Sequence, residues 1–285
     1  TLLASSAASD VYKRQDKDLA VDQEGGLLRG YQLTYIPESL KVLGRQCGYI
    51  FYVPAAYTSK IDPTTGFVAI FNYKGMTDKD FVTSFDSIKY DDERGLFAFE
   101  FDYENFVTHK VEMARNKWTV YTYGERIKRK FKNGLWDTAE KVDLTYQMRS
   151  ILEKYEIEYN KGQDILEQIE ELDEKAQNGI CKEIKYLVKD IVQMRNSLPD
   201  NAAEDYDAII SPVINNNGEF FDSTRGDEDK PLDADANGAY CIALKGLYEV
   251  MQIKKNWNDE TEFPRKELKI RHQDWFDFIQ NKRYL

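Results

Sequence analysis

The segment from Asp233 to Tyr240 (DADANGAY) places two carboxylates and several small residues where a helix is expected to begin. A carboxylate in a first helical turn accepts backbone N–H groups and is favoured by the helix dipole, so a helix cap is the simplest interpretation. A carboxylate fixed at such a junction is also a good ligand for a hard cation. Because Asp233 and Asp235 are two residues apart, one of them can cap the helix while the other has a second role.

A second candidate is Arg195, which continues the apolar series Ile184, Val188 and Ile191 at helical spacing. The pattern therefore predicts that the helical period extends to Arg195. An arginine at a helix end can snorkel and interact with the C-terminal dipole. Its planar guanidinium can instead face a cleft and bind a phosphate. The residues alone leave both interpretations open.

A third candidate is the stretch 108–132, which has eight Lys and Arg residues against two Glu. Trp118, Tyr121 and Tyr123 stand between these charges. Basic side chains bind phosphates and aromatic rings stack on unpaired bases, so the stretch is either a nucleic-acid contact or an ordinary solvated strand face. The candidate contacts are Lys117, Arg126, Lys128, Arg129, Lys130 and Lys132.

A fourth candidate is Asp207, an acidic residue just ahead of the apolar run 209–213. Its simplest interpretation is a turn residue. Cys47, Cys181 and Cys241 are odd in number and far apart, which favours buried thiols in a reducing cytoplasm over a secreted disulfide framework. With only two His in addition, a zinc site is not expected, and a catalytic metal would need oxygen ligands, as magnesium does.

The elements that position these residues are expected within a chain of 285 residues with a net charge of −11. Its 42% apolar and 13% aromatic content is typical of a folded core, and no run reaches the roughly 20 apolar residues that cross a bilayer. The period is helical from Ala139 to Arg195, and residues 153–174 are predicted to form a solvated acidic helix surface or loop. The patterns further predict a buried strand (48–53), a turn (59–66), antiparallel strands (97–103, 118–124), a hairpin (209–213 with 219–221 across 215–218) and helices (236–253, 272–282).

Several motifs, in order, resemble the C-terminal part of the type V-A CRISPR-associated effector nucleases, which are single-protein RNA-guided DNA endonucleases. The motifs are GGLLRGYQLT, GYIFYVPAAYTSKIDPTTGFV, YGERI, QMRNS, IISPV with NNGEFFDS, and DADANGAYCIALKG. The resemblance covers about residues 18–285. It implies an α/β fold in which a partial RNase H-like (RuvC) domain is interrupted by an α+β nuclease (Nuc) domain.

The resemblance also implies boundaries and roles. Residues 1–17 would be a foreign or disordered extension, 18–56 the end of the second RuvC segment, 57–232 the Nuc domain, and 233–285 the third RuvC segment. Asp235 matches the family's third catalytic carboxylate and metal ligand, Arg195 its Nuc-domain arginine, and Asp207 an acidic Nuc residue.

The cofactors and partners implied are magnesium, a guide RNA and target DNA, for a cytoplasmic monomer without membrane contact. The chain begins with Thr1, and we expect it to be the C-terminal piece of a longer protein whose upstream part carries two further carboxylates. The chain alone is therefore expected to be inactive. The alternatives are a non-catalytic nucleic-acid-binding module and an acidic protein-interaction domain that uses residues 153–174.

Overall fold

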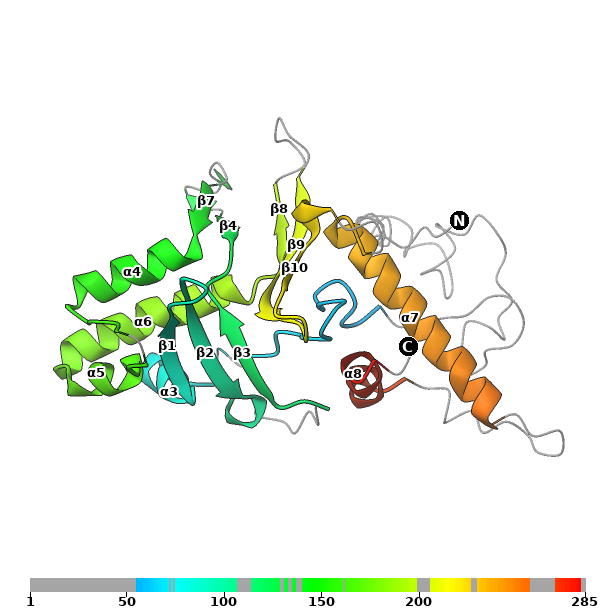
Figure 1. Ribbon diagram of the computed structural model, residues 1–285, viewed down its shortest axis with the longest axis horizontal. Helices are drawn as coiled ribbons and strands as arrows, with labels where there is room; N and C mark the ends of the chain where they lie inside the picture. Colours follow the sequence, from blue (N-terminus) through cyan, green and yellow to red (C-terminus); the bar gives the residue numbers. More distant parts are fainter. Residues whose placement is uncertain are drawn as a thin grey trace.

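The computed structural model describes residues 55–71, 73, 75–106, 114–128, 131–132, 135–136, 140–160, 162–198, 206–226, 230–256 and 270–282. Helices α3 to α6 gather at one end of the molecule, small antiparallel sheets occupy the middle, and α7 and α8 lie at the other end (Figure 1). The predicted strand 48–53 and Cys47 lie outside the described residues. Within the described part, no helix combines the length and the apolar character needed to cross a membrane.

The first sheet is the antiparallel meander β1 (Ser87–Asp91), β2 (Leu96–Asp102) and β3 (Lys117–Tyr121). Alternate residues of β2 point into the core, where Phe97, Phe99 and Phe101 are buried. Such alternation of buried and exposed positions is the signature of a strand with one covered face. The strands predicted at 97–103 and 118–124 are thereby confirmed.

Four helices share a hydrophobic core with this sheet: α3 (Asp78–Thr83), α4 (Leu144–Lys154), α5 (Ile165–Glu171) and α6 (Glu174–Ile191). Each begins with a capping side chain that accepts a backbone N–H, which satisfies one of the otherwise unpaired donors of the first turn. The caps are Thr77, Asp143, Asp164 and Asp173. The predicted apolar stripe of α6 is buried. The acidic stretch 153–174 includes the last residues of α4, the whole of α5 and the first residue of α6. Its isoleucines are buried.

The second sheet has the order β10-β9-β8, formed by β8 (Arg195–Ser197), β9 (Asp207–Ile214) and β10 (Phe220–Asp222). The predicted hairpin is confirmed, since β9 and β10 pair antiparallel. Asn215 accepts the N–H groups of Asn217 and Glu219, and Gly218 adopts a φ of 82°, a backbone conformation that glycine tolerates best. Two shorter pairs join β4 (Glu125–Lys128) to β7 (Glu140–Asp143) and β5 (Phe131–Lys132) to β6 (Leu135–Trp136).

The helical period was predicted to run from Ala139 to Arg195, and this prediction is wrong at both ends. Residues 140–143 form strand β7, and α6 ends at Ile191, so Arg195 opens strand β8. The reason lies in tertiary hydrogen bonds. The side chain of Asn196 bonds the backbone of β4, which holds the chain extended next to Arg195. Intrinsic periodicity is a weak prior that such contacts override.

Helices α7 (Ala234–Asn256) and α8 (His272–Gln280) confirm the two predicted C-terminal helices. They share a second hydrophobic cluster with the loop that includes Ile61 and Val68. Helix α7 buries one side only, because Tyr240, Leu247 and Val250 are exposed. Cys241 on α7 and Cys181 on α6 are buried thiols, as predicted for those two residues. The described residues thus form a mixed α/β fold with small antiparallel sheets.

The predicted turn at 59–66 is also confirmed, and it is fixed by one buried carboxylate. Asp62 accepts hydrogen bonds from Thr64 and Thr65 and from the hydroxyl of Ser211 on β9, at 2.6 Å. Gly66 closes the turn with a φ of 73°. The loop is therefore tied directly to the sheet that carries the candidate site.

Candidate active site

Three residues that the sequence singled out from separate segments lie together in the structure. Arg195 opens β8, Asp207 opens β9, and Asp235 stands in the first turn of α7. Arg195 donates from Nε to Oδ1 of Asp207 at 3.0 Å and from Nη2 to Oδ2 at 3.1 Å. Its Nη2 also lies 3.2 Å from Oδ1 of Asp235. The guanidinium is therefore shared by two carboxylates from different elements.

The strand register explains why Arg195 meets Asp207. Across the β8–β9 ladder, Arg195 lies opposite Ile209 and Ser197 lies opposite Asp207. Arg195 and Asp207 are therefore diagonal neighbours on one face of the sheet, a separation that a long side chain spans. The side chains of Arg195, Asp207 and Asp235 are 31%, 20% and 23% exposed, so the cluster is partly open to solvent.

The two acids at the start of α7 divide the roles that the sequence left open. Asp233 caps the helix, accepting the N–H of Ala236 at 2.6 Å, while Asp235 faces Arg195. Asn237 donates to the carbonyl of Ile61 at 2.9 Å and anchors this turn to the loop beneath it. The helix start is thus held from two sides, which fixes the position of the Asp235 carboxylate.

Behind the site, Arg126 is completely buried, which corrects its prediction as a nucleic-acid contact. Its guanidinium donates to the carbonyls of Asp190 and Ile191 at the end of α6 and of Ile210 on β9. It also donates to the carbonyls of Tyr123 and Glu125. Burial lowers the pKa of Arg126 to about 10, which leaves it charged at neutral pH. Arg126 therefore joins three elements that support the site.

Asn196 is a second supporting residue, and sequence reasoning missed it. Its Oδ1 accepts the N–H of Ile127 at 2.7 Å and its Nδ2 donates to the carbonyl of Glu125 at 3.1 Å. These bonds attach β8 to β4. Strand alternation places Asn196 on the face opposite Arg195, so a strand assignment for QMRNS would have identified it.

Burial, one guanidinium and the neighbouring carboxylates together set the electrostatics of the cluster. Burial raises the pKa of the Asp207 carboxyl, and the charges of Asp235 and Asp233 act in the same direction. The guanidinium of Arg195 acts in the opposite direction. Among the described residues, the Arg195 guanidinium therefore lies close to three acids, Asp207, Asp233 and Asp235.

The described carboxylates do not form a magnesium site by themselves. Within the described ranges, no group of three or more His, Cys, Asp or Glu side chains is placed to hold a metal ion. Both oxygens of Asp207 accept hydrogen bonds from Arg195, and Oδ1 of Asp235 pairs with the same group. A hard cation needs about six oxygen ligands, more than this cluster offers.

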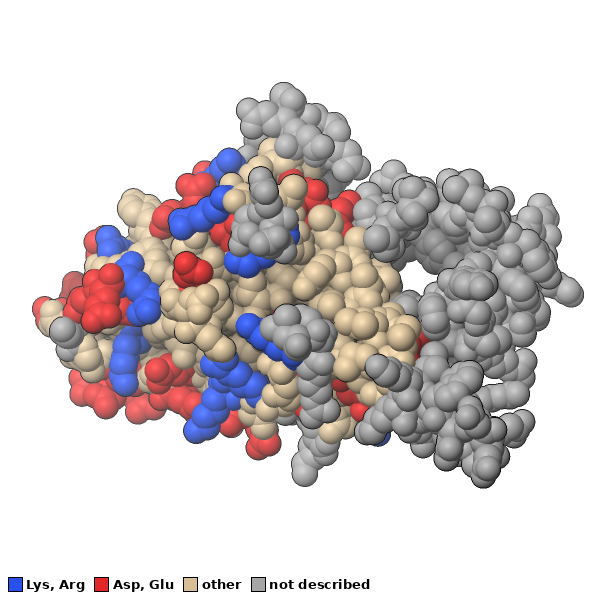
Figure 2. Space-filling view, turned by 45° about the vertical axis from the view of Figure 1, so that its right-hand side comes forward, with Lys and Arg blue, Asp and Glu red and all other residues tan. Residues whose placement is uncertain are grey.

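The basic stretch 108–132 does not form a continuous face in the described residues. Lys117 on β3 is exposed, whereas Lys128 pairs with Asp190 and donates to Gln147. The side chains of Arg129, Lys130 and Lys132 lie outside the described residues. Acidic and basic residues are interspersed over the part of the surface in Figure 2 that lies toward the helical end. Among the described residues, Lys117 is the predicted contact that stays exposed.

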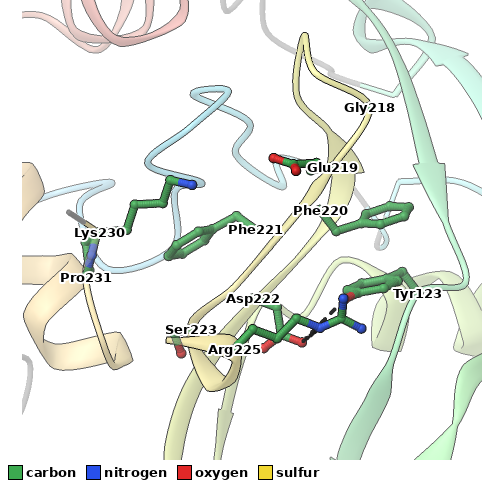
Figure 3. A pocket seen from close by; sticks show the side chains of 10 residues that line it. All are labelled: Tyr123, Gly218, Glu219, Phe220, Phe221, Asp222, Ser223, Arg225, Lys230 and Pro231. Atoms are coloured by element: carbon green, nitrogen blue, oxygen red, sulfur yellow. Dashed lines mark hydrogen bonds and ion pairs between the residues drawn. The ribbon is translucent and has the colours of Figure 1, made fainter. Parts of the chain in front are cut away.

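The aromatic residues of this stretch are already packed. Trp118 and Tyr121 are buried, so they are not available to stack on a base. Tyr123 stacks on Phe220 with ring centroids 3.9 Å apart, and Arg225 lies over the Tyr123 ring while pairing with Asp222. These residues line a pocket of about 380 Å³ beside β10 (Figure 3). The prediction of base stacking is wrong for Trp118 and Tyr121.

Comparison with known proteins places the described sheets in one family. The family model of the nuclease (NUC) domain matches residues 61–225. The match includes helices α3 to α6 and strands β1 to β10, with Arg195 and Asp207 among its residues. Asp235 lies ten residues beyond its end, on α7.

Proposed function

Since the chain belongs to the nuclease (NUC) domain family, we propose that it forms the RuvC/Nuc portion of an RNA-guided, magnesium-dependent DNA endonuclease of CRISPR antiviral defence. One observation carries the proposal. Arg195, inside the matched segment, meets Asp235, outside it, at 3.2 Å. These are the two residues to which the family resemblance assigns a phosphate contact and a catalytic carboxylate. Their contact supports a shared site for cleavage of phosphodiester bonds.

The chemistry proposed for this chain's own residues follows from their types. The planar guanidinium of Arg195 can bind two phosphate oxygens and stabilise the charge that grows on them during cleavage. Asp235 supplies one carboxylate, and magnesium dependence requires oxygen ligands beyond those described. In the RNA-guided class, base pairing with the guide selects the target, so these residues would act on any sequence.

The partners of the proposed enzyme are a guide RNA and the target DNA, and it would act as a cytoplasmic monomer. The proposed boundaries assign residues 57–232 to the Nuc domain and residues 18–56 and 233–285 to RuvC segments. The matched segment 61–225 falls within this Nuc assignment and supports its core.

Cleavage by the guide-loaded, full-length protein tests the proposal. Asp235→Asn should lower the rate of target cleavage at least about 100-fold, since removing one essential electrostatic group typically costs that much. Asp233→Asn is the matched control, because Asp233 accepts the N–H of Ala236 and Asn caps a helix as well as Asp does. Target binding, measured separately, should be unchanged in both variants. Equal cleavage by Asp235→Asn and the unchanged protein would refute the proposal.

The present chain offers a second test in a plasmid-nicking assay with magnesium. Because the resemblance assigns two catalytic carboxylates to upstream residues, we expect no cleavage by this chain alone. Metal-dependent cleavage by the purified chain would contradict that expectation. Binding of DNA without cleavage even in the full-length protein would favour a non-catalytic nucleic-acid-binding module.

A further inference from the structure

We propose that Asp207 is a positioning residue, which holds the guanidinium of Arg195 toward the phosphate and does not itself take part in cleavage. This inference rests on the proposed function, since it assigns a role within the same site. The sequence left Asp207 between a turn residue and an acidic residue of the nuclease domain. The geometry points to a third role, in which it acts through Arg195.

The first support is the form of the contact. Asp207 receives two hydrogen bonds from one edge of the guanidinium, at 3.0 and 3.1 Å, one on each of its oxygens. A paired contact of this kind fixes the plane of the guanidinium as well as its distance. Oδ1 of Asp235 lies 3.2 Å from Nη2 of the same guanidinium. Asp207 therefore sets the orientation, and Asp235 meets the group that Asp207 has oriented.

The second support is the rigidity of the two backbones. Arg195 and Asp207 belong to paired strands, and the ladder between them fixes their diagonal separation. The backbone at Arg195 is further held by the side chain of its neighbour Asn196. The backbone after Asp207 is held at Ile209, whose N–H donates to the hydroxyl of Ser223. A positioning contact needs such a frame, because a side chain held by mobile partners gains no fixed direction.

The third support is the competition between the two acids. A guanidinium near two carboxylates is attracted to both, and partial burial strengthens each attraction. Without Asp207, the guanidinium would turn fully onto Asp235. That movement would take Arg195 from the phosphate and would mask the Asp235 carboxylate. Loss of Asp207 should therefore mimic loss of Arg195.

A double-mutant cycle in the guide-loaded, full-length protein tests this inference. Arg195→Ala, Asp207→Ala and the double variant are compared by single-turnover cleavage of bound target. We expect Asp207→Ala to slow cleavage about tenfold to 100-fold and the double variant to equal Arg195→Ala, since residues that act as one unit are not additive. The magnesium concentration at half-maximal rate should not change on loss of Asp207. Asp207→Asn, which keeps one acceptor oxygen, should retain more activity than Asp207→Ala.

The controls separate positioning from folding. Asp222, on strand β10 of the same sheet, also pairs with an arginine, Arg225. The Asp222→Asn protein loses this charge and should cleave DNA normally. In the present chain, the Nε–H proton of Arg195, followed by ¹⁵N NMR, should be protected from exchange with water. This protection should be lost in Asp207→Asn, while the unfolding temperature of the variant stays within a few degrees of that of the unchanged chain. Loss of the folded state in Asp207→Ala alone would leave Asp207→Asn as the deciding variant.

The possible outcomes point to different conclusions. Additive losses in the cycle, or a raised magnesium requirement, would assign Asp207 to metal binding and overturn this inference alone. Unchanged cleavage by Asp207→Asn and Asp207→Ala would overturn it as well. If the unchanged guide-loaded protein does not cleave DNA at all, the proposed function itself falls, and the positioning role falls with it.

Discussion

At the scale of single residues, the structure distinguishes two arginines near the sheet β10-β9-β8 that have different roles. Arg195 is partly exposed and touches two acids, whereas Arg126 is buried and bonds backbone carbonyls. Both occur in motifs shared with the nuclease family, and their sequence context does not distinguish them. Surface exposure and the type of partner distinguish them, because a guanidinium that is partly open to solvent can contact a phosphate.

Replacing Arg126 tests its structural role. Arg126→Met removes several buried hydrogen bonds from a charged donor to backbone carbonyls, and each such bond contributes about 1.5–3 kcal/mol. We expect the free energy of unfolding to fall by at least about 3 kcal/mol in urea titrations followed by fluorescence. Lys117→Met, at an exposed position on β3, is the control and should change it by less than about 0.5 kcal/mol. Equal stability of the two variants would contradict the role.

Replacing Arg195 tests its role in cleavage. Arg195→Lys keeps the charge and loses the planar fork, so cleavage by the guide-loaded protein should slow while guide-directed binding is retained. Cleavage rates and binding affinities are measured in parallel. Unchanged cleavage of both DNA strands would remove Arg195 from the mechanism.

Glu249 on α7 gives the chain a pH-dependent stability. The side chain is fully buried, and within the described part of the chain neither carboxyl oxygen has a hydrogen-bond partner. Burial raises its pKa from 4.5 to about 7. The folded state therefore keeps the proton between pH 4.5 and 7 while the unfolded chain releases it, so stability is lost as the pH rises through this window. Glu249→Gln stays neutral and should gain up to about 3 kcal/mol over the unchanged chain at pH 8.

Unfolding measured at pH 4 and pH 8 checks this prediction. The two proteins should be similar at pH 4, where both side chains are neutral. Lys245, one turn earlier on α7, has a pKa lowered to about 8 by burial, but it is present in both proteins and cancels in the comparison. A constant difference at both pH values would show that Glu249 does not titrate as proposed.

At the scale of elements, two helical glycines differ in the space around them. A Cβ on Gly179 in α6 would lie 2.5 Å from the hydroxyl of Tyr155, which bonds Glu183. A Cβ on Gly238 in α7 would meet Ser59 at 3.7 Å, an ordinary contact. Helix α6 therefore needs its glycine, and α7 does not.

Alanine at the two positions gives a matched comparison. Gly179→Ala should destabilise the chain by about 1–3 kcal/mol through overpacking. Gly238→Ala should stabilise it by up to about 1 kcal/mol, because alanine favours a helix and no clash opposes it. Thermal unfolding of both variants decides, and a lower melting temperature for Gly238→Ala than for Gly179→Ala would contradict the packing of both helices.

The elements that the sequence predicts correctly are those with local causes. The aromatic alternation at 97–103 and the Asn-rich turn at 215–218 each contain the reason for their own structure. The end of α6 has a distant cause, since Asn196 and Arg126 bond segments about 70 residues away. Composition likewise counts Arg126 as a surface charge, because counting does not show which way a side chain points.

The candidate site was predictable in part. The family resemblance selected Arg195, Asp207 and Asp235, and the structure brings these three together. Residues alone left each of them with an ordinary structural alternative, because only the pairing of β8 with β9 and the docking of α7 place them side by side. Their catalytic roles stay predictions until the cleavage experiments are done.

The whole molecule carries a net charge of −11, which opposes association with DNA at long range. Local basic side chains must therefore provide any binding, and such contacts are sensitive to salt. We expect the chain to bind a labelled single-stranded oligonucleotide at 50 mM salt and to lose at least tenfold in affinity at 200 mM. Lys117→Gln should weaken binding by fluorescence anisotropy, and an affinity independent of salt would exclude this mode of contact.

The contact between Arg195 and Asp235 crosses the limit of the matched nuclease segment. In a chimaera of two related enzymes whose junction lies at residue 225, Arg195 would come from one protein and helix α7 from the other. Arg195 would keep its own Asp207 but would face the Asp235 of a different protein. Chimaeras should therefore work only when the junction lies beyond residue 235, with the first turn of α7 travelling together with the sheet that it faces.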